Sequence, residues 1–169
     1  MNVLVLGGSL GAQALNLMVP DVLSPYIDSD AVKIKHQCGR DKKRATEVAY
    51  GTRAEQVEIH EFIQNMDLLY AAADMLISRA GAGSISELCI VGKPVILIPS
   101  PNVAEDHQTK NAKAITDKNA GILLQEQNID TLPEVIKILL EDASQRVVLS
   151  ENIKKLALPD ATKQIADEV

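Results

Sequence analysis

Six short apolar segments alternate with longer segments of helical periodicity, and this alternation restricts the possible folds more than any other feature of the sequence. The apolar segments are rich in Val, Ile and Leu and rarely alternate with polar residues, which is typical of strands buried on both faces of a parallel sheet. They cover residues 3–6, 32–36, 57–61, 75–78, 95–98 and 121–124. The helical segments cover residues 12–19, 42–50, 66–73, 84–91 and 105–118, and two or three further helices are expected from residue 132 onward.

Strands that alternate with helices form right-handed βαβ units. The sequence therefore predicts an α/β fold: a doubly wound, Rossmann-like parallel sheet of about six strands with helices on both faces. A length of 169 residues suits one such domain with its own core. Ligands of these sheets bind beyond the carboxyl ends of the strands, where the strand order reverses. Function is therefore expected in the loops that follow strands.

The composition disfavours several other classes of protein. A net charge of −6 argues against a broad nucleic-acid surface, which needs clustered Lys and Arg. No apolar run approaches the roughly 18 residues of a transmembrane helix. Cys38 and Cys89 are expected to be reduced, partly buried thiols. Because the chain opens directly on a strand, we expect either a naturally short protein or an excised domain to which Met1 was added.

The first unusual loop, residues 7–13, is rich in glycine and joins a strand to a helix. Glycine permits positive φ and close approach of backbone N–H groups to an anion, and the helix start adds its dipole. Phosphate binding and the simple geometry of a tight turn both account for this composition. A dinucleotide site is disfavoured, because the second strand ends in His36, Gln37, Cys38 and Gly39 and offers no carboxylate to a ribose.

The second loop, residues 78–87, places the small residues of the segment 81–84 before a helix, where their N–H groups can hold a diphosphate. Glu87 follows Ser84 by three residues, which allows two interpretations. Ser84 and Glu87 can form a capping box at the helix start. Alternatively, the Glu87 carboxylate can accept hydrogen bonds from both hydroxyls of a ribose whose diphosphate lies on the adjacent N–H groups.

The third loop, residues 99–108, ends in Asp106, His107 and Gln108. Imidazole and amide groups both donate and accept hydrogen bonds, so His107 and Gln108 suit sugar hydroxyls, although a polar helix start also accounts for them. Asp106 alternatively caps the helix. His107 has no second His or Cys at the spacing of a metal site.

Four further features have structural interpretations. His36 and His60 lie on predicted strands and are expected to be structural histidines with satisfied hydrogen bonds. Phe62 follows the third strand and is expected in the core, with a place beside a nucleotide base as the alternative. Residues 41–44 are expected to form a solvated helix start.

Five segments in order and spacing resemble the C-terminal, UDP-GlcNAc-binding domain of MurG-type N-acetylglucosaminyltransferases. They are residues 3–12, 60–66, 78–87, 106–112 and the Pro-Asp-Ala-Thr sequence at 159–162, so the resemblance covers nearly the whole chain. Enzymes of this family have two Rossmann-like domains, the GT-B arrangement, and transfer GlcNAc from UDP-GlcNAc to the 4-hydroxyl of MurNAc on lipid I with inversion. The product is lipid II, the precursor of peptidoglycan.

The resemblance implies that residues 1–169 form the donor-binding domain and that the N-terminal, acceptor-binding domain, with the catalytic base, is absent from this chain. It implies a bacterial cytoplasmic enzyme, peripheral at the inner face of the cell membrane, with no metal, no cofactor and no nucleic-acid partner. Its implied substrate-binding residues are Gly8, Ser9, Gly83 and Ser84 at the diphosphate, Glu87 at the ribose, Phe62 and the Ile63 backbone at the uracil, and Ala82, His107 and Gln108 at the GlcNAc. Many members of the family carry Gln in place of His107.

Two alternatives remain. A natural one-domain subunit, similar to the catalytic half of the two-subunit dolichol-linked GlcNAc transferase, would recruit a membrane partner; the Gly-rich first loop and the Pro-Asp-Ala-Thr sequence favour the MurG-type family. A non-catalytic UDP-sugar-binding module would share the anion-binding loops, would not need the sugar-facing His107 and Gln108, and should bind UDP as well as UDP-GlcNAc.

Overall fold

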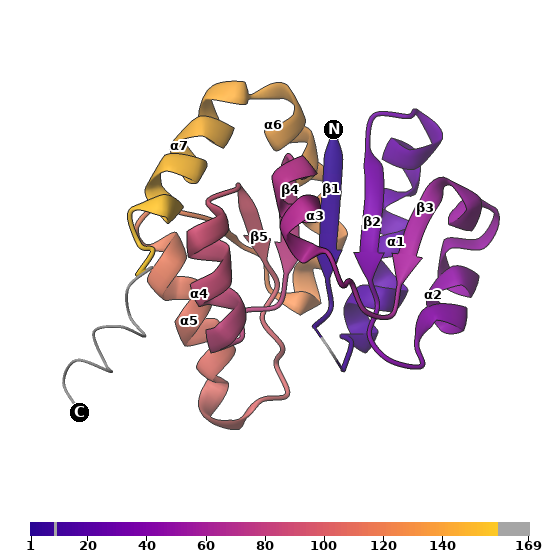
Figure 1. The fold of residues 1–169 in the computed structure, drawn as a ribbon, viewed down its shortest axis with the longest axis horizontal. Coiled ribbons are helices and arrows are strands. Elements are labelled where there is room, and N and C mark those ends of the chain that lie inside the picture. The colour runs from indigo at the N-terminus through magenta and orange to yellow at the C-terminus, as the bar shows by residue number, and fades with distance from the viewer. Residues whose placement is uncertain (9, 159–169) are drawn as a thin grey trace.

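The computed structural model describes residues 1–8 and 10–158. Six parallel strands form one sheet in the order β3-β2-β1-β4-β5-β6 (Figure 1). The strands are β1 (Asn2–Leu6), β2 (Lys33–Gln37), β3 (Val57–His60), β4 (Met75–Ser78), β5 (Val95–Leu97) and β6 (Ile122–Leu123). All six predicted strands and the predicted doubly wound α/β fold are confirmed, and the strand order reverses between β1 and β4.

The α-helices lie in two layers, one on each face of the sheet (Figure 1). They are α1 (Gln13–Asp28), α2 (Lys43–Tyr50), α3 (Met66–Ala72), α4 (Ala82–Val91), α5 (His107–Thr116), α6 (Leu132–Glu141) and α7 (Ala143–Lys154). Three short 3-10 segments are η1 (Gly51–Gln56), η2 (Ala104–Asp106) and η3 (Glu126–Thr131). Among the residues described, no helix is long and apolar enough to cross a membrane. Of the two or three helices expected from residue 132 onward, α6 and α7 are present, and a third, which the Pro-Asp-Ala-Thr sequence at 159–162 would start, lies outside the described residues.

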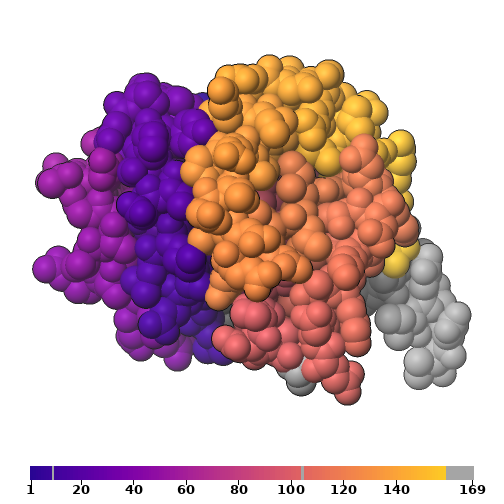
Figure 2. All heavy atoms as spheres, turned by 180° about the vertical axis from the view of Figure 1, so that it is seen from behind, coloured from indigo at the N-terminus to yellow at the C-terminus, as the bar shows by residue number. Residues whose placement is uncertain are grey.

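The side chains of β1 alternate between the two cores. Val3 and Val5 pack with α1, α2 and α6, whereas Leu4 and Leu6 pack with α3, α4 and α5. Seen from behind, α1 lies beside the segment that contains η3 and α6 (Figure 2). Because both faces of β1 are buried, the strand shows the continuous apolar run of a central parallel strand.

Helix α1 is longer than the sequence predicted. It was expected to end at residue 19 but continues through Pro20 and Pro25 to Asp28. A proline inside a helix removes one N–H donor and usually ends the helix. Here the side chains of Leu15, Val19, Leu23 and Ile27 remain buried at helical spacing along the core, so tertiary packing outweighs the lost hydrogen bonds.

Helix α5 begins at His107, two residues later than predicted. Glu105 and Asp106 adopt positive φ values of 54° and 51°, which are not those of an α-helix, so α5 cannot begin before His107. Asp106 occupies the N-cap position, but its side chain makes no capping hydrogen bond. Asp106 is thus at the predicted N-cap position, but the predicted capping hydrogen bond from its carboxylate is not formed.

Candidate functional site

Two adjoining cavities lie at the carboxyl ends of the strands, where the strand order reverses. The larger, of about 430 Å³, lies among the loops that follow β1, β4 and β5. The smaller, of about 290 Å³, lies between the loop after β3 and helix α4. Gly8, Arg79 and Ser84 line both cavities. The three loops that the sequence singled out thus meet at one edge of the sheet, as predicted.

The glycines of the first loop have different requirements. Gly8 and Gly11 both adopt positive φ, 79° and 76°. A Cβ on Gly11 would lie 2.1 Å from the Cys38 carbonyl oxygen, whereas a Cβ on Gly8 would meet nothing within 4 Å. Close packing therefore requires glycine at position 11, and Gly8 faces open space beside both cavities. The tight turn therefore accounts for Gly11, and room for a ligand accounts for Gly8.

A buried polar network holds this loop against β2. Asn16 of α1 donates from Nδ2 to the Cys38 carbonyl at 2.7 Å, and its Oδ1 lies 3.0 Å from His36 Nε2. His36 Nδ1 lies 2.9 Å from the Tyr50 hydroxyl. Since the Asn16 oxygen can only accept, Nε2 of His36 carries the proton and Tyr50 donates to Nδ1. Burial lowers the pKa of His36 to about 3, so the ring stays neutral. The predicted structural role of His36 is confirmed.

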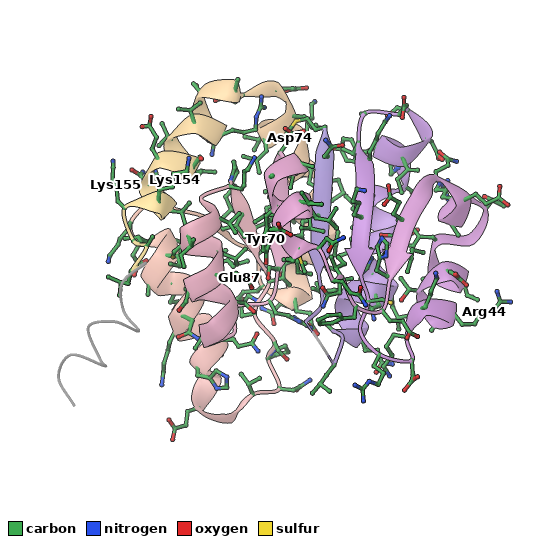
Figure 3. The ribbon with its side chains drawn as sticks, in the orientation of Figure 1. Arg44, Tyr70, Asp74, Glu87, Lys154 and Lys155 are labelled. Carbon is green, nitrogen blue, oxygen red and sulfur yellow. The ribbon has the colours of Figure 1, made fainter. Side chains whose placement is uncertain are left out.

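The start of α4 excludes the capping box. The N-cap is Gly81, and no side chain makes a capping hydrogen bond there. Ser84 lies inside the first turn, so Ser84 and Glu87 do not occupy the N-cap and N3 positions. Glu87 is exposed and lines the smaller cavity beside Tyr70 of α3 (Figure 3). Burial, reinforced by the Glu87 charge, raises the pKa of Tyr70, which therefore keeps its proton next to this carboxylate.

Arg79 is a site residue to which the sequence assigned no role. Its Nη1 donates to the Ile98 carbonyl at 3.0 Å, and its Nη2 lies 2.5 Å from Oε2 of Glu126 in η3. This is a close contact of charges rather than an aligned hydrogen bond, because Oε2 has no hydrogen-bond partner that meets the angular criteria. The sequence could have pointed to Arg79, because it is the only charged residue in a segment of small residues, 78–84. Its partner Glu126 could not be identified from the sequence.

The third loop is anchored by amide side chains. Gln108 Oε1 accepts a hydrogen bond from the Ser100 backbone N–H at 3.0 Å, and Asn111 donates to the Ala80 carbonyl at 3.0 Å. Gln108 lines the larger cavity, and His107 is exposed at the first position of α5. These contacts hold the loop after β5 against the loop after β4.

Residues 2–165 match the family model of the glycosyltransferase family 28 C-terminal domain. The chain belongs to this family. It is 52% identical over 168 residues to the UDP-N-acetylglucosamine--N-acetylmuramyl-(pentapeptide) pyrophosphoryl-undecaprenol N-acetylglucosamine transferase of Flavobacterium psychrophilum. The aligned region covers 99% of this chain and 45% of that protein. The same enzyme of Christiangramia forsetii is 48% identical over 171 residues, with 99% and 45% covered.

A crystal structure of MurG from Acinetobacter baumannii superposes on this family 28 domain with a TM-score of 0.86 and 31% sequence identity, covering 99% of the domain and 49% of that chain. The resemblance predicted from the five sequence segments is confirmed. The chain spans about half the length of the relatives it matches.

Six of the ten expected substrate-binding residues of this family 28 domain line the two cavities: Gly8, Phe62, Ile63, Ser84, Glu87 and Gln108. Ala82, Gly83 and His107 are exposed at helix starts next to the cavities. Ser9 and the sequence at 159–162 lie outside the described residues. In the described part of the domain, no three His, Cys, Asp or Glu side chains are grouped as a metal site requires.

Two expectations about residues near the site are wrong. Phe62 is 66% exposed and lines the smaller cavity instead of packing in the core. His60 is not satisfied, because its enclosed Nε2 has no hydrogen-bond partner among the described residues and lies 3.7 Å from Glu58 Oε2. His60 is the last residue of β3 and Phe62 follows the strand. At this end of the sheet the alternation of side chains along a strand no longer determines which residues are buried.

Proposed function

We propose that this family 28 domain binds UDP-GlcNAc and is the donor half of an inverting glycosyltransferase that moves GlcNAc to the 4-hydroxyl of MurNAc on lipid I, giving lipid II. The observation that carries the proposal is the junction of the two cavities at Gly8, Arg79 and Ser84. A nucleoside fits the smaller cavity, a sugar fits the larger one, and the diphosphate joins them at the start of α4. The names of the relatives support the same substrates.

The diphosphate lies at the N-terminus of α4 and beside the first loop. Gly8, Gly83 and Ser84 surround it, and the family resemblance assigns Ser9 to the same group. The free N–H groups and dipole of the helix start favour its negative charge. Arg79 adds a guanidinium at the same junction. When UDP departs, negative charge grows on the diphosphate, so these groups stabilise the transition state more than the ground state.

The two ends of the donor occupy opposite cavities. Glu87 accepts hydrogen bonds from the ribose hydroxyls, and uracil lies beside Phe62 with its edge on the Ile63 backbone. The GlcNAc extends into the larger cavity, where Ala82, His107 and Gln108 contact its hydroxyls. The catalytic base that takes the proton of the acceptor hydroxyl lies on the N-terminal domain of the complete enzyme, which also binds lipid I at the inner face of the bacterial cell membrane.

Titration calorimetry of this chain with UDP-GlcNAc, in buffer with and without EDTA, tests the donor site. We expect equal binding in both buffers and at least tenfold weaker binding of ADP, which keeps the diphosphate and replaces the base. Loss of UDP-GlcNAc binding in EDTA would overturn the metal-free arrangement. Equal affinity for UDP and UDP-GlcNAc would remove the support for a sugar subsite and favour a nucleotide-binding module.

A transfer assay with labelled UDP-GlcNAc and a soluble lipid I analogue tests whether this chain supplies only the donor site and the N-terminal domain supplies the acceptor site and the base. We expect no measurable transfer by this chain alone and transfer after the matching N-terminal domain is added. Alignment of two reactants in a closed cleft contributes about 7–11 kcal/mol to lowering a barrier, and this chain lacks both that alignment and the base. Clear turnover by the chain alone would place the acceptor site and the base within these 169 residues.

A further inference from the structure

A row of three side chains forms the floor of the smaller cavity. Gln37 pairs with Leu6 across β2 and β1, and Leu6 pairs with Ser78 across β1 and β4. Paired residues of parallel strands point to the same face of the sheet, here the face covered by α3 and α4. All three residues line the cavity. The last residue of each of three adjacent strands therefore faces the smaller cavity.

Gln37 is the one member of this row whose polar group is not satisfied. The Ser78 hydroxyl donates to the Arg79 carbonyl at 2.9 Å. Gln37 is only 5% exposed, and its Oε1 is enclosed without a hydrogen-bond partner among the described residues. Burial of an amide without a partner costs free energy. Leu6 and Leu88 line the cavity next to the polar side chains of Arg79 and Glu87, so a molecule bound there can supply the hydrogen bond that the Gln37 amide lacks.

We propose that the Gln37 amide hydrogen-bonds the pyrimidine base of the bound nucleotide and contributes to the selection of uracil. This inference rests on the proposed function. Strand β2 lies between β3, whose loop carries Phe62 and Ile63, and β1, whose loop carries Gly8. Gln37 is therefore on the base side of the diphosphate loop, and its strand β2 is separated by β1 from β4, the strand that precedes α4 and Glu87.

The chemistry of the two groups is complementary. Uracil in a nucleotide has one N–H donor and two carbonyl acceptors, and the C=O and N–H of the Ile63 backbone suit the N–H and one of the carbonyl oxygens. The second carbonyl oxygen of the base is then left for the Nε2 donor of Gln37, whose amide oxygen and nitrogen exchange places when the terminal group rotates by half a turn. A side chain anchored at the end of a buried strand holds this contact in a fixed position.

A purely structural role for Gln37 makes the opposite prediction for stability. His60 pairs with Gln37 across β2 and β3, and its Nε2 is also enclosed without a hydrogen bond. A bond between these two side chains would satisfy both, and removal of the amide would then destabilise the domain. If Gln37 serves a ligand instead, an apolar replacement removes an unsatisfied amide and stabilises the ligand-free domain or leaves its stability unchanged.

The test uses the whole chain with Gln37→Leu, and Gln37→Met as a second, unbranched replacement in case Leu does not fit. Gln56→Leu is the matched control, because Gln56 is an exposed residue at the end of η1, immediately before β3. We expect Gln37→Leu to bind UDP about three- to tenfold more weakly, the loss of one hydrogen bond, with an unchanged or higher melting temperature without ligand. Gln56→Leu should change neither quantity.

Ribose 5-diphosphate, which lacks the base, separates base contacts from contacts with the sugar and phosphates. We expect wild type and Gln37→Leu to bind it equally. Wild-type binding of UDP with no loss in either Gln37 variant would overturn this inference alone, as would an equal loss with ribose 5-diphosphate. A lowered melting temperature with unchanged UDP affinity would indicate a Gln37–His60 pair. Failure of the wild type to bind UDP would overturn the proposed function itself.

Discussion

Arg79 and Glu126 form an ion pair in the wall of the larger cavity, with Nη2 and Oε2 separated by 2.5 Å. The two side chains are only 13% and 20% exposed. Arg79 follows β4 and Glu126 follows β6, so the pair spans the intervening strand β5, and the carbonyl of Ile98, which follows β5, accepts a hydrogen bond from Arg79. The pair connects the junction of the two cavities to the far edge of the sheet and places a negative charge beside the proposed diphosphate site.

Glu126→Gln is expected to raise the affinity for UDP. The substitution removes one negative charge from the cavity and frees Arg79 to interact with the diphosphate, which should contribute about 1 kcal/mol, or roughly fivefold in affinity. Calorimetric Kd values at 50 mM and 500 mM salt check this prediction. The gain should shrink at high salt because screening weakens the interaction. Unchanged or weaker binding at low salt would show that Glu126 positions Arg79 for the ligand.

Arg79→Met is expected to reduce stability and UDP affinity together. It leaves the Glu126 carboxylate with no cation in a largely enclosed wall, and loss of one partner of a buried pair costs about 3–5 kcal/mol, with less expected here because both side chains keep some exposure. Urea denaturation measures the loss. The double variant Arg79→Met/Glu126→Gln should recover part of it, and a double variant no more stable than the single would contradict the pairing.

Glu87→Ala is expected to weaken UDP binding without unfolding the domain. A lost hydrogen bond to a charged group costs about 1.5–3 kcal/mol, or roughly 10- to 150-fold in affinity. The melting temperature should barely change, because Gly81 and not Ser84 caps α4. Glu151→Ala, an exposed residue of α7, is the control. The deficit should disappear with 2′,3′-dideoxy-UDP, which lacks the ribose hydroxyls; a persistent deficit would place Glu87 elsewhere on the ligand.

The buried His36 makes stability depend on pH in a defined window. Its pKa is lowered by burial to about 3, whereas in the unfolded chain it is about 6.5. Between these values the unfolded state binds the extra proton, so the free energy of unfolding falls as pH decreases below 6.5, by about 1.4 kcal/mol per pH unit, and is independent of this group above 6.5.

Urea denaturation between pH 5.0 and 7.5 measures this slope above the range in which carboxylates titrate. His36→Gln should abolish the slope that His36 contributes. Tyr50→Phe is the matched control, since it removes one hydrogen bond of the ring but keeps the buried histidine, and it should lower stability at every pH while retaining the slope. Equal slopes in wild type and His36→Gln would show that His36 is not the titrating group.

Gly8 and Gly11 are expected to respond differently to alanine although both have positive φ. Gly8→Ala meets open space and should cost only the backbone strain of about 1–2 kcal/mol. Gly11→Ala should cost a further 1–3 kcal/mol or so, because its Cβ would lie 2.1 Å from the Cys38 carbonyl oxygen and the network through Asn16 would have to move. Comparison of the two free energies of unfolding checks this difference, and equal losses would refute it.

The elements of the fold followed from local patterns. An apolar run such as residues 95–98 has the composition of a buried parallel strand wherever it lies in the chain, and glycine between a strand and a helix indicates a tight turn, with or without an anion site, from local sequence alone. Parallel strands then place the loops after β1, β4 and β5 at one edge of the sheet. These arguments need only periodicity and the handedness of βαβ units, which are properties of short segments.

Contacts between distant residues were decided by the tertiary structure. Helix α1 passes through Pro20 because its apolar face packs on the core, and Ser84 does not cap α4 because the helix begins two residues earlier. The Arg79–Glu126 pair and the unsatisfied amide of Gln37 depend on strand order and register. Periodicity specifies which face of an element is apolar, but the partner of a buried polar group is fixed only when the strands are assembled side by side.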